Sequence, residues 1–231
     1  MDADPQTRLE GTPKKITPRW LWSGWTLAAG LVILAAAAAG GWIWARTQAP
    51  GLQGAIVTPP APTYDFRLRD QHDQMIQLSG LRGKAVALTF LYANCPDVCP
   101  LIANKIHEAY QQLGAAAPRV ALVAVSVDPN GDTPLAVRRF LTTHGVEGEL
   151  HYLTGSFAEL RPVWAHYYVG SDAKEVNPQA AAASAAPPGP VAHTAIVYVL
   201  DPRGNLRVFL PGNFDPKDLA TDLKILAAEA R

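Results

Sequence analysis

Cysteine is scarce in this sequence. The 231 residues contain only Cys95 and Cys99, which stand in the stretch NCPDVCP with three residues between them. Two cysteines this close can form a structural disulfide, act as a redox pair or supply two ligands to a metal ion. A structural disulfide gains little here, because the stabilisation that a disulfide gives grows with the length of the loop it closes. The sequence therefore favours functional chemistry, with which a reversible disulfide is compatible.

Net charge is also missing, since 20 basic and 20 acidic side chains balance, and no nucleic-acid partner is expected. Residues 20–45 contain no charged residue at all, yet they hold five of the six tryptophans. As a helix, this segment is long enough to cross a ~30 Å hydrocarbon layer, and its tryptophans mark the two ends as interfacial belts. We predict a retained transmembrane anchor in the lipid bilayer. The alternative is a cleaved signal peptide, whose apolar core is usually shorter.

Basic residues indicate the orientation of this anchor. Four of them precede the apolar segment, and only Arg46 follows it closely. The positive-inside rule therefore predicts that residues 1–19 form a cytoplasmic tail. Acidic residues in this tail argue against a mitochondrial transit peptide. We predict a single-pass protein of the bacterial inner membrane with a periplasmic C-terminal domain, in a compartment where thiols are under oxidising pressure.

The remainder of the chain divides by composition. Residues 46–62 are rich in proline, glycine and small side chains, which predicts a flexible linker. Residues 63–231 are long enough to form one domain with a good core. Within that domain, the low-complexity stretch at 177–190 is interpreted as a mobile surface insertion.

Apolar periodicity within the domain alternates between strand and helix patterns. Nearly continuous apolar runs at 84–92 and 119–127 predict buried central strands. Further strands are predicted in a hairpin at 66–78, at 149–154, at 193–201 and at 206–210, and helices at 100–113, 134–144, 156–168 and 216–230. This order predicts an α/β fold with a central mixed sheet flanked by helices.

The two cysteines come directly after the first buried strand, and ligands of open α/β sheets bind at the carboxyl ends of strands. Pro100 disfavours the α conformation for Cys99 and suits the first turn of a helix. We therefore expect residues 95–99 to form a loop that leads into a helix N-terminus. Free N–H groups and the helix dipole would stabilise a thiolate there.

His193 is the third candidate ligand, because it opens the apolar run HTAIVYVL. If this strand lies antiparallel beside strand 84–92, its start lies next to the cysteine loop. Two thiolates and one imidazole suit copper in either oxidation state. They also suit zinc, but a structural zinc site usually has a fourth protein ligand. Thioether ligands are scarce, since Met75 is the only methionine after the initiator.

Three segments in order, CPDVCP, VSVDPNGDTP and VAHTAIVYVLDPRGNLR, resemble the SCO (SCO/SenC) family of copper-binding proteins in cytochrome c oxidase assembly. The resemblance covers about residues 62–231 and the single anchor. It implies a thioredoxin-like fold and copper bound by Cys95, Cys99 and His193, with Asp128 as a neighbour of the ligands. Ala192 departs from the acidic residue that many members have before the histidine. The YAN stretch before Cys95 departs from a Thr-containing one.

The resemblance implies a membrane-anchored copper chaperone that handles Cu(I), Cu(II) or both and supports assembly of the CuA site of cytochrome c oxidase. The expected partners are the CuA-bearing oxidase subunit and another periplasmic copper chaperone. A thiol–disulfide reductase that keeps oxidase cysteines reduced is the second hypothesis. The CxxxC spacing departs from the CxxC of thioredoxin-like reductases, which counts against it as the main role. A peroxidase with one reactive and one resolving thiol is the third.

Overall fold

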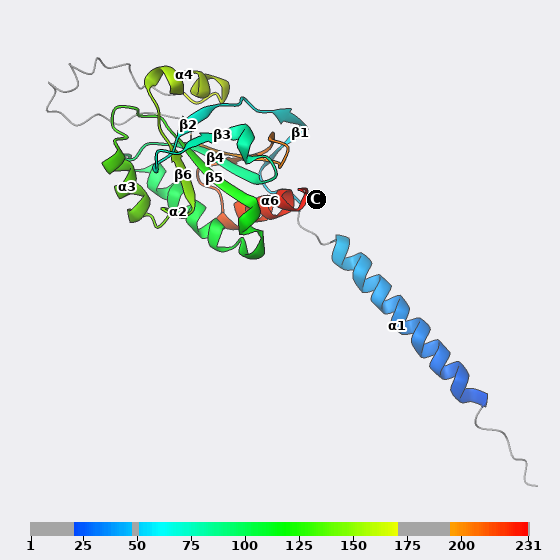
Figure 1. Cartoon of the computed structure of the whole chain (residues 1–231). Coiled ribbons are helices and arrows are strands. Elements are labelled where there is room, and N and C mark those ends of the chain that lie inside the picture. The colour runs from blue at the N-terminus through cyan, green and yellow to red at the C-terminus, as the bar shows by residue number, and fades with distance from the viewer. Residues whose placement is uncertain (1–20, 48–50, 171–194, 231) are drawn as a thin grey trace, which may run out of the picture. The chain divides into compact units, whose positions relative to one another are not determined.

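The computed structural model describes residues 21–47, 51–170 and 195–230 (Figure 1). The chain separates after Ala49 into two compact units, an N-terminal helix and a folded domain. The insertion predicted at 177–190 lies outside the described residues.

The described part of the N-terminal unit is the helix α1 (Leu21–Thr47), of 27 residues. This confirms a helix over the predicted apolar segment. Its described side chains include large apolar ones that are exposed, such as Trp25, Leu31 and Trp42. Within the described part of the chain, no helix combines the length and apolarity of a membrane span. The structure thus gives the helix, and the membrane crossing stays a prediction.

A six-stranded mixed sheet forms the centre of the domain. Its strand order is β1-β8-β7-β4-β5-β6. The strands are β1 (Ala55–Pro62), β4 (Ala85–Leu91), β5 (Val120–Ser126), β6 (Leu150–Leu153), β7 (Ile196–Leu200) and β8 (Asn205–Pro211). Strands β4, β5 and β6 run parallel, whereas β7, β8 and β1 add as antiparallel neighbours. Every residue of β4 and β5 is buried, because parallel strands are covered on both faces.

Helices cover both faces of this sheet. Figure 1 shows α2 (Val98–Gln111) and α6 (Pro216–Ala228) on one side and α4 (Phe157–His166) on the other. Helix α3 (Pro134–Thr143) connects β5 to β6. A small second sheet of β2 (Arg67–Arg69) and β3 (Met75–Gln77) forms the predicted hairpin, and 3₁₀ helices η1 (Leu78–Leu81) and η2 (Gly114–Arg119) complete the domain. The arrangement confirms the predicted α/β fold with a mixed sheet between helices.

Local capping explains where the helices begin. The Thr133 hydroxyl accepts a hydrogen bond from the Ala136 N–H, and Pro134 occupies the first turn. Ser156 and Glu159 form a capping box at the start of α4. Each cap satisfies backbone donors that the first turn leaves without partners, and such a cap contributes about 1 kcal/mol.

One expectation was wrong, because the flexible linker does not extend to residue 62. From Ala55 the chain forms β1, which pairs antiparallel with β8. The sequence carries no strand signal here because the segment contains three prolines, and proline has no N–H to donate to the hydrogen bonds of a sheet. An edge strand tolerates proline, and the pairing register shifts between Ile56 and Ala61, where two of the three lie.

The pairing of β4 with β7 bears directly on the predicted site. These strands are antiparallel, with Leu88 opposite Tyr198 and Thr89 opposite Val197. The Thr89 hydroxyl also donates to the Ile196 carbonyl oxygen at 3.0 Å. The start of β7 therefore lies beside the carboxyl end of β4, as predicted.

Candidate metal and redox site

The two cysteines lie where β4 ends and α2 begins. Cys95 stands in the connecting loop, and Cys99 is the second residue of α2. Both are free thiols and buried, with exposed fractions of 8% for Cys95 and 0% for Cys99. The structure thus places two of the three predicted ligands at the carboxyl edge of the sheet.

Helix α2 begins two residues before Pro100, so the expectation that Cys99 lies outside the helix was wrong. Pro100 occupies the third position of α2. A helix tolerates proline in its first turn because the N–H that proline lacks has no intrahelical partner there. This start aims the Cys99 N–H at the neighbouring sulfur, and it donates to Cys95 Sγ at 3.4 Å.

The environments of the two thiols differ. Burial disfavours the Cys95 thiolate, but hydrogen bonds from the backbone N–H groups of Asp97 and Cys99 outweigh it and lower the pKa of Cys95. Burial raises the pKa of the Cys99 thiol, and negative charge on Cys95 and Asp132 raises it further. Cys95 is therefore the sulfur that ionises first.

Asp128 lies in the loop that follows β5. Its Oδ1 accepts a hydrogen bond from the Gly131 N–H at 3.0 Å, and its carbonyl oxygen accepts one from the Asp132 N–H at 2.9 Å. A Cβ at residue 131 would lie 2.0 Å from Asp128 Oδ2, so only glycine allows this approach. The Asp128 carboxylate thus stabilises its own loop. A role for Asp128 beside the metal ligands stays a prediction.

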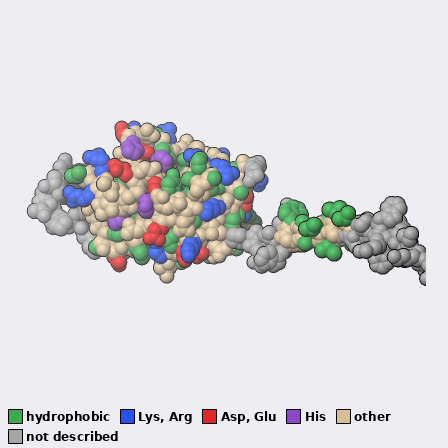
Figure 2. All heavy atoms as spheres, turned by 90° about the horizontal axis from the view of Figure 1, so that it is seen from below, with side chains coloured by type: hydrophobic (Ala, Val, Ile, Leu, Met, Phe, Trp, Pro, Cys, Tyr) green, Lys and Arg blue, Asp and Glu red, His purple; other side chains and the backbone are tan. Residues whose placement is uncertain are grey.

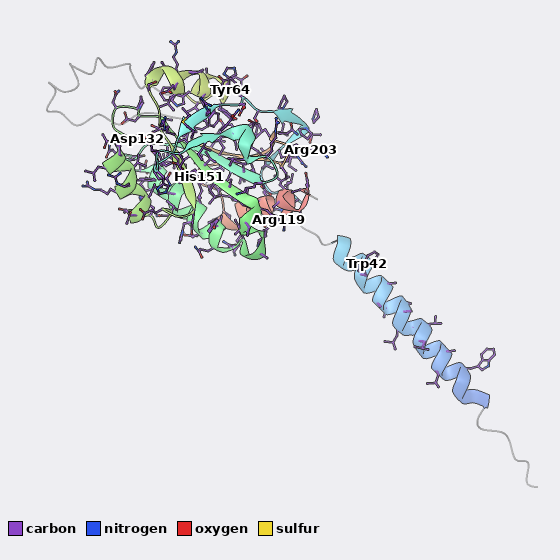
Figure 3. All side chains as sticks on the ribbon, in the orientation of Figure 1. Trp42, Tyr64, Arg119, Asp132, His151 and Arg203 are labelled. Atoms are coloured by element: carbon purple, nitrogen blue, oxygen red, sulfur yellow. The ribbon has the colours of Figure 1, made fainter. Side chains whose placement is uncertain are left out.

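Asp132 is the site residue that sequence reasoning missed (Figure 3). One carboxylate oxygen accepts the Ala93 N–H at 2.7 Å, two residues before Cys95. The other accepts the hydroxyls of Ser126 at 2.5 Å and Tyr152 at 2.9 Å. Burial raises the pKa of this carboxyl to about 6, although these hydrogen bonds oppose the shift. In the sequence, Asp132 stands directly before Thr133, the cap of α3, and no local pattern marks it as a buried acceptor.

A second bond joins the same two loops. The Asn94 side-chain amide donates to the Gly131 carbonyl oxygen at 3.1 Å. Together with the bond from Ala93 to Asp132, it holds the cysteine loop against the loop after β5. No pattern within either segment predicts this link, because its partners are separated by 37 residues in the chain.

A cavity of about 420 Å³ opens beside Cys95, between the cysteine loop and α3. Its lining is partly apolar, with Pro100, Leu135 and Phe140 among its residues. Cys95 contributes to this lining, whereas Cys99 does not. Cys95 therefore lines a space that a partner can enter, whereas Cys99 is fully buried.

His193, the third predicted ligand, lies outside the described residues. Among the residues that are described, no group of three or more His, Cys, Asp and Glu side chains could hold a metal ion. The two cysteines are soft ligands of the kind that select copper, so the donors that are placed fit that metal.

Comparison with known proteins assigns the family. A family model described as SCO1/SenC matches residues 58–228, and the chain belongs to this family. Its α/β fold is consistent with the thioredoxin-like fold that the sequence resemblance implies.

Solved structures and curated proteins agree with this assignment. The copper-bound structure of ScoI from Bradyrhizobium japonicum is 30% identical and covers 72% of this chain and 99% of its own, with a TM-score of 0.60. Copper-bound Sco1 from yeast is 25% identical over 70% of this chain and 85% of its own, with a TM-score of 0.59. An SCO2-like protein of Rickettsia conorii is 32% identical over 77 residues, which are 33% of this chain and 38% of that relative.

Proposed function

We propose that this protein binds copper through the thiolates of Cys95 and Cys99 and passes it to a partner protein, with His193 as the third ligand. The observation that carries the proposal is the pair of free thiols at the start of α2, joined by the bond from the Cys99 N–H to Cys95 Sγ. Copper-bound relatives of the same family support the choice of metal.

The unequal thiols suggest an order of events. Cys95 lines the cavity and ionises first, so it is the sulfur that meets incoming copper. Cys99 then loses its proton as it binds, because a thiolate rather than a thiol is the metal ligand. Transfer proceeds in reverse, with a cysteine of the partner replacing one protein sulfur at a time. Copper that moves between soft ligands in this way never leaves a thiolate environment.

The partner, by this proposal, is the CuA-bearing subunit of cytochrome c oxidase, with another periplasmic copper chaperone as the donor. An anchor at residues 20–45 and a periplasmic domain belong to the same proposal. The uncharged segment and α1 support the anchor. Tethering beside a membrane-bound acceptor would raise the effective concentration of the domain.

Copper titration of the reduced full chain tests the function. We expect about one copper ion per chain, because two thiolates and an imidazole form one soft site. Cys95→Ser or Cys99→Ser should weaken binding by more than the ~10–100-fold that loss of an outer partner costs a metal site. His193→Ala should also weaken binding, and His72→Ala serves as its control, because His72 is exposed in the turn between β2 and β3. Unchanged affinity in the His193 variant would remove it from the site.

Membrane extraction tests the anchor. Alkaline carbonate should leave the full chain in the membrane pellet, because an apolar span resists extraction. Replacing Leu31 and Leu34 together by Arg should release it, since charges at the centre of a span are costly. Recovery of the unchanged chain in the supernatant would contradict the anchor.

The asymmetry of the thiols also supports a second function, a thiol–disulfide reductase. The Cys95 thiolate would attack one sulfur of a partner disulfide and release the other partner sulfur as a thiolate. Cys99 would then attack Cys95 Sγ, close the Cys95–Cys99 disulfide and release the second partner thiolate. Metal-free reduced chain should in that case reduce the partner without copper, and the His193→Ala variant should act as fast as the wild type.

A further inference from the structure

The cavity beside Cys95, here named the Cys95 groove, has a one-sided charge. Of the 13 described residues that line it, only Arg139 and His144 carry side chains that can be positive, and none of these 13 is acidic. Burial lowers the pKa of His144, and its Nδ1 lies 2.9 Å from the Asn104 side-chain oxygen. His144 is therefore mainly neutral near pH 7, which leaves Arg139 as the charge among the described residues that line the groove.

Arg139 is available for a partner. Among the described residues, its guanidinium forms no ion pair and no side-chain hydrogen bond, and the residue is exposed. Arg207 provides the contrast, since it lies 2.7 Å from Glu229 and 3.5 Å from Asp201. Figure 2 shows Lys and Arg side chains at the end of the domain where Figure 1 places α3.

The same groove offers apolar surface. Leu135, on the first turn of α3, is 62% exposed although it is a large apolar side chain. Pro100 lines the groove from α2, and Phe140, which is only 4% exposed, lines it from the same helix as Leu135. One helix therefore presents a leucine and a cation without an ion-pair partner to the same groove that Cys95 lines.

We propose that the Cys95 groove binds an extended peptide segment of the partner in which an acidic side chain lies next to the exchanging cysteine. Arg139 pairs with the carboxylate, Leu135 contacts an apolar side chain, and the partner sulfur meets Cys95. A volume of about 420 Å³ holds several side chains of such a segment. The inference rests on the proposed function, because exchange at Cys95 requires a partner cysteine.

A copper-free exchange reaction tests the groove separately from metal binding. The probes are two short synthetic peptides, each with one leucine and one cysteine, in which the cysteine is flanked by glutamates or by glutamines. Each cysteine is activated as a disulfide with 5-thio-2-nitrobenzoate. The Cys95 thiolate of the reduced full chain attacks the peptide sulfur, the new Cys95–peptide disulfide forms, and the aromatic thiolate leaves with the electron pair of the broken S–S bond. Its absorbance gives the rate.

We expect the glutamate peptide to react about tenfold faster than the glutamine peptide at low ionic strength, and salt to reduce the difference. Arg139→Glu should abolish or reverse the preference. Arg138→Glu is the matched control, because it makes the same charge change on the neighbouring residue, which lines a different cavity. Leu135→Ser should slow both peptides by a similar factor, because it removes an apolar contact that the two peptides share.

Equal rates for the two peptides with the wild type would overturn the proposal, as would an acidic preference that survives Arg139→Glu. A Leu135→Ser variant that reacts with both peptides as fast as the wild type would show that the groove selects charge alone. A small acidic thiol would satisfy such a groove, so this result would overturn the proposal that a peptide segment binds there. If the wild type binds no copper but shows the acidic preference, the proposed function fails and the groove stands. If it binds copper without the preference, the groove fails and the proposed function stands.

Discussion

Two neighbouring loops at the carboxyl edge of the sheet have different roles. The loop after β4 carries Cys95 and leads to Cys99. Its own backbone supports it, since the Cys95 N–H donates to the Tyr92 carbonyl oxygen at 3.2 Å and the Cys99 N–H donates to Cys95 Sγ at 3.4 Å. The loop after β5 is closed by the side chains of Asp128 and Asp132. It also holds the first loop, through Ala93 and Asn94. The reactive groups and the groups that position them therefore occupy separate segments of the chain.

The largest expected effect concerns the two cysteines. Iodoacetamide should modify Cys95 at least ~100-fold faster than Cys99 in the folded reduced chain, because each unit of pKa changes the thiolate fraction tenfold. The measurement is peptide mass mapping over time. In denaturant the two rates should become similar, and similar rates in the folded chain would contradict the assigned asymmetry.

The next largest effect is expected from removing the Asp132 carboxylate, which holds the cysteine loop. Asp132→Ala leaves the Ser126 and Tyr152 hydroxyls and the Ala93 N–H without their partner in a buried site. We expect the free energy of unfolding to fall by about 3 kcal/mol. Urea denaturation gives the value. Asp97→Ala, which removes an exposed acid beside Cys95, is the control and should change stability by less than about 0.5 kcal/mol. Equal losses in both variants would refute the distinction between the loops.

The pH dependence of stability tests the burial of the Asp132 carboxyl. The folded pKa of Asp132 is about 6, above its ordinary value of 3.8, so the folded state holds this proton more tightly than the unfolded state. The stabilisation is complete below the unfolded pKa and is lost as the pH rises through about 6. Asp132→Asn lacks this dependence.

Between pH 4 and 7, the stability of the Asp132→Asn variant relative to the wild type should therefore rise by up to about 3 kcal/mol. Urea denaturation of both proteins across this range checks it. A difference that stays constant with pH would mean that burial does not disfavour the charged form of Asp132.

The smallest expected effect tests the helix that lines the groove. Thr133→Ala removes the side-chain cap of α3 and should lower the free energy of unfolding by about 1 kcal/mol. Thr143→Ala at the exposed last position of α3 is the control, with a change close to zero. A loss of several kcal/mol at Thr133 would mean that this residue supports the cysteine loop as well as the helix.

Some features were predictable from the sequence because their signals are local. The uninterrupted apolar runs at 84–92 and 119–127 indicate β4 and β5, since strands buried on both faces need apolar residues throughout. The caps at Thr133 and Ser156 act within three residues. Strand β1 was missed because proline is a negative local signal that the sheet edge overrides.

The sequence alone indicated the order of strands and helices from β2 onward and the position of the cysteine pair after a buried strand. The tertiary structure was needed to show that Cys99 is fully buried while Cys95 lines a groove. It was also needed to show that Asp132 accepts hydrogen bonds from residues 93, 126 and 152. It also decided that Arg139 shares a cavity with Cys95. The physical reason is range: periodicity and capping act over a few residues, whereas burial, charge and hydrogen-bond partners at a site come from segments that meet only after folding.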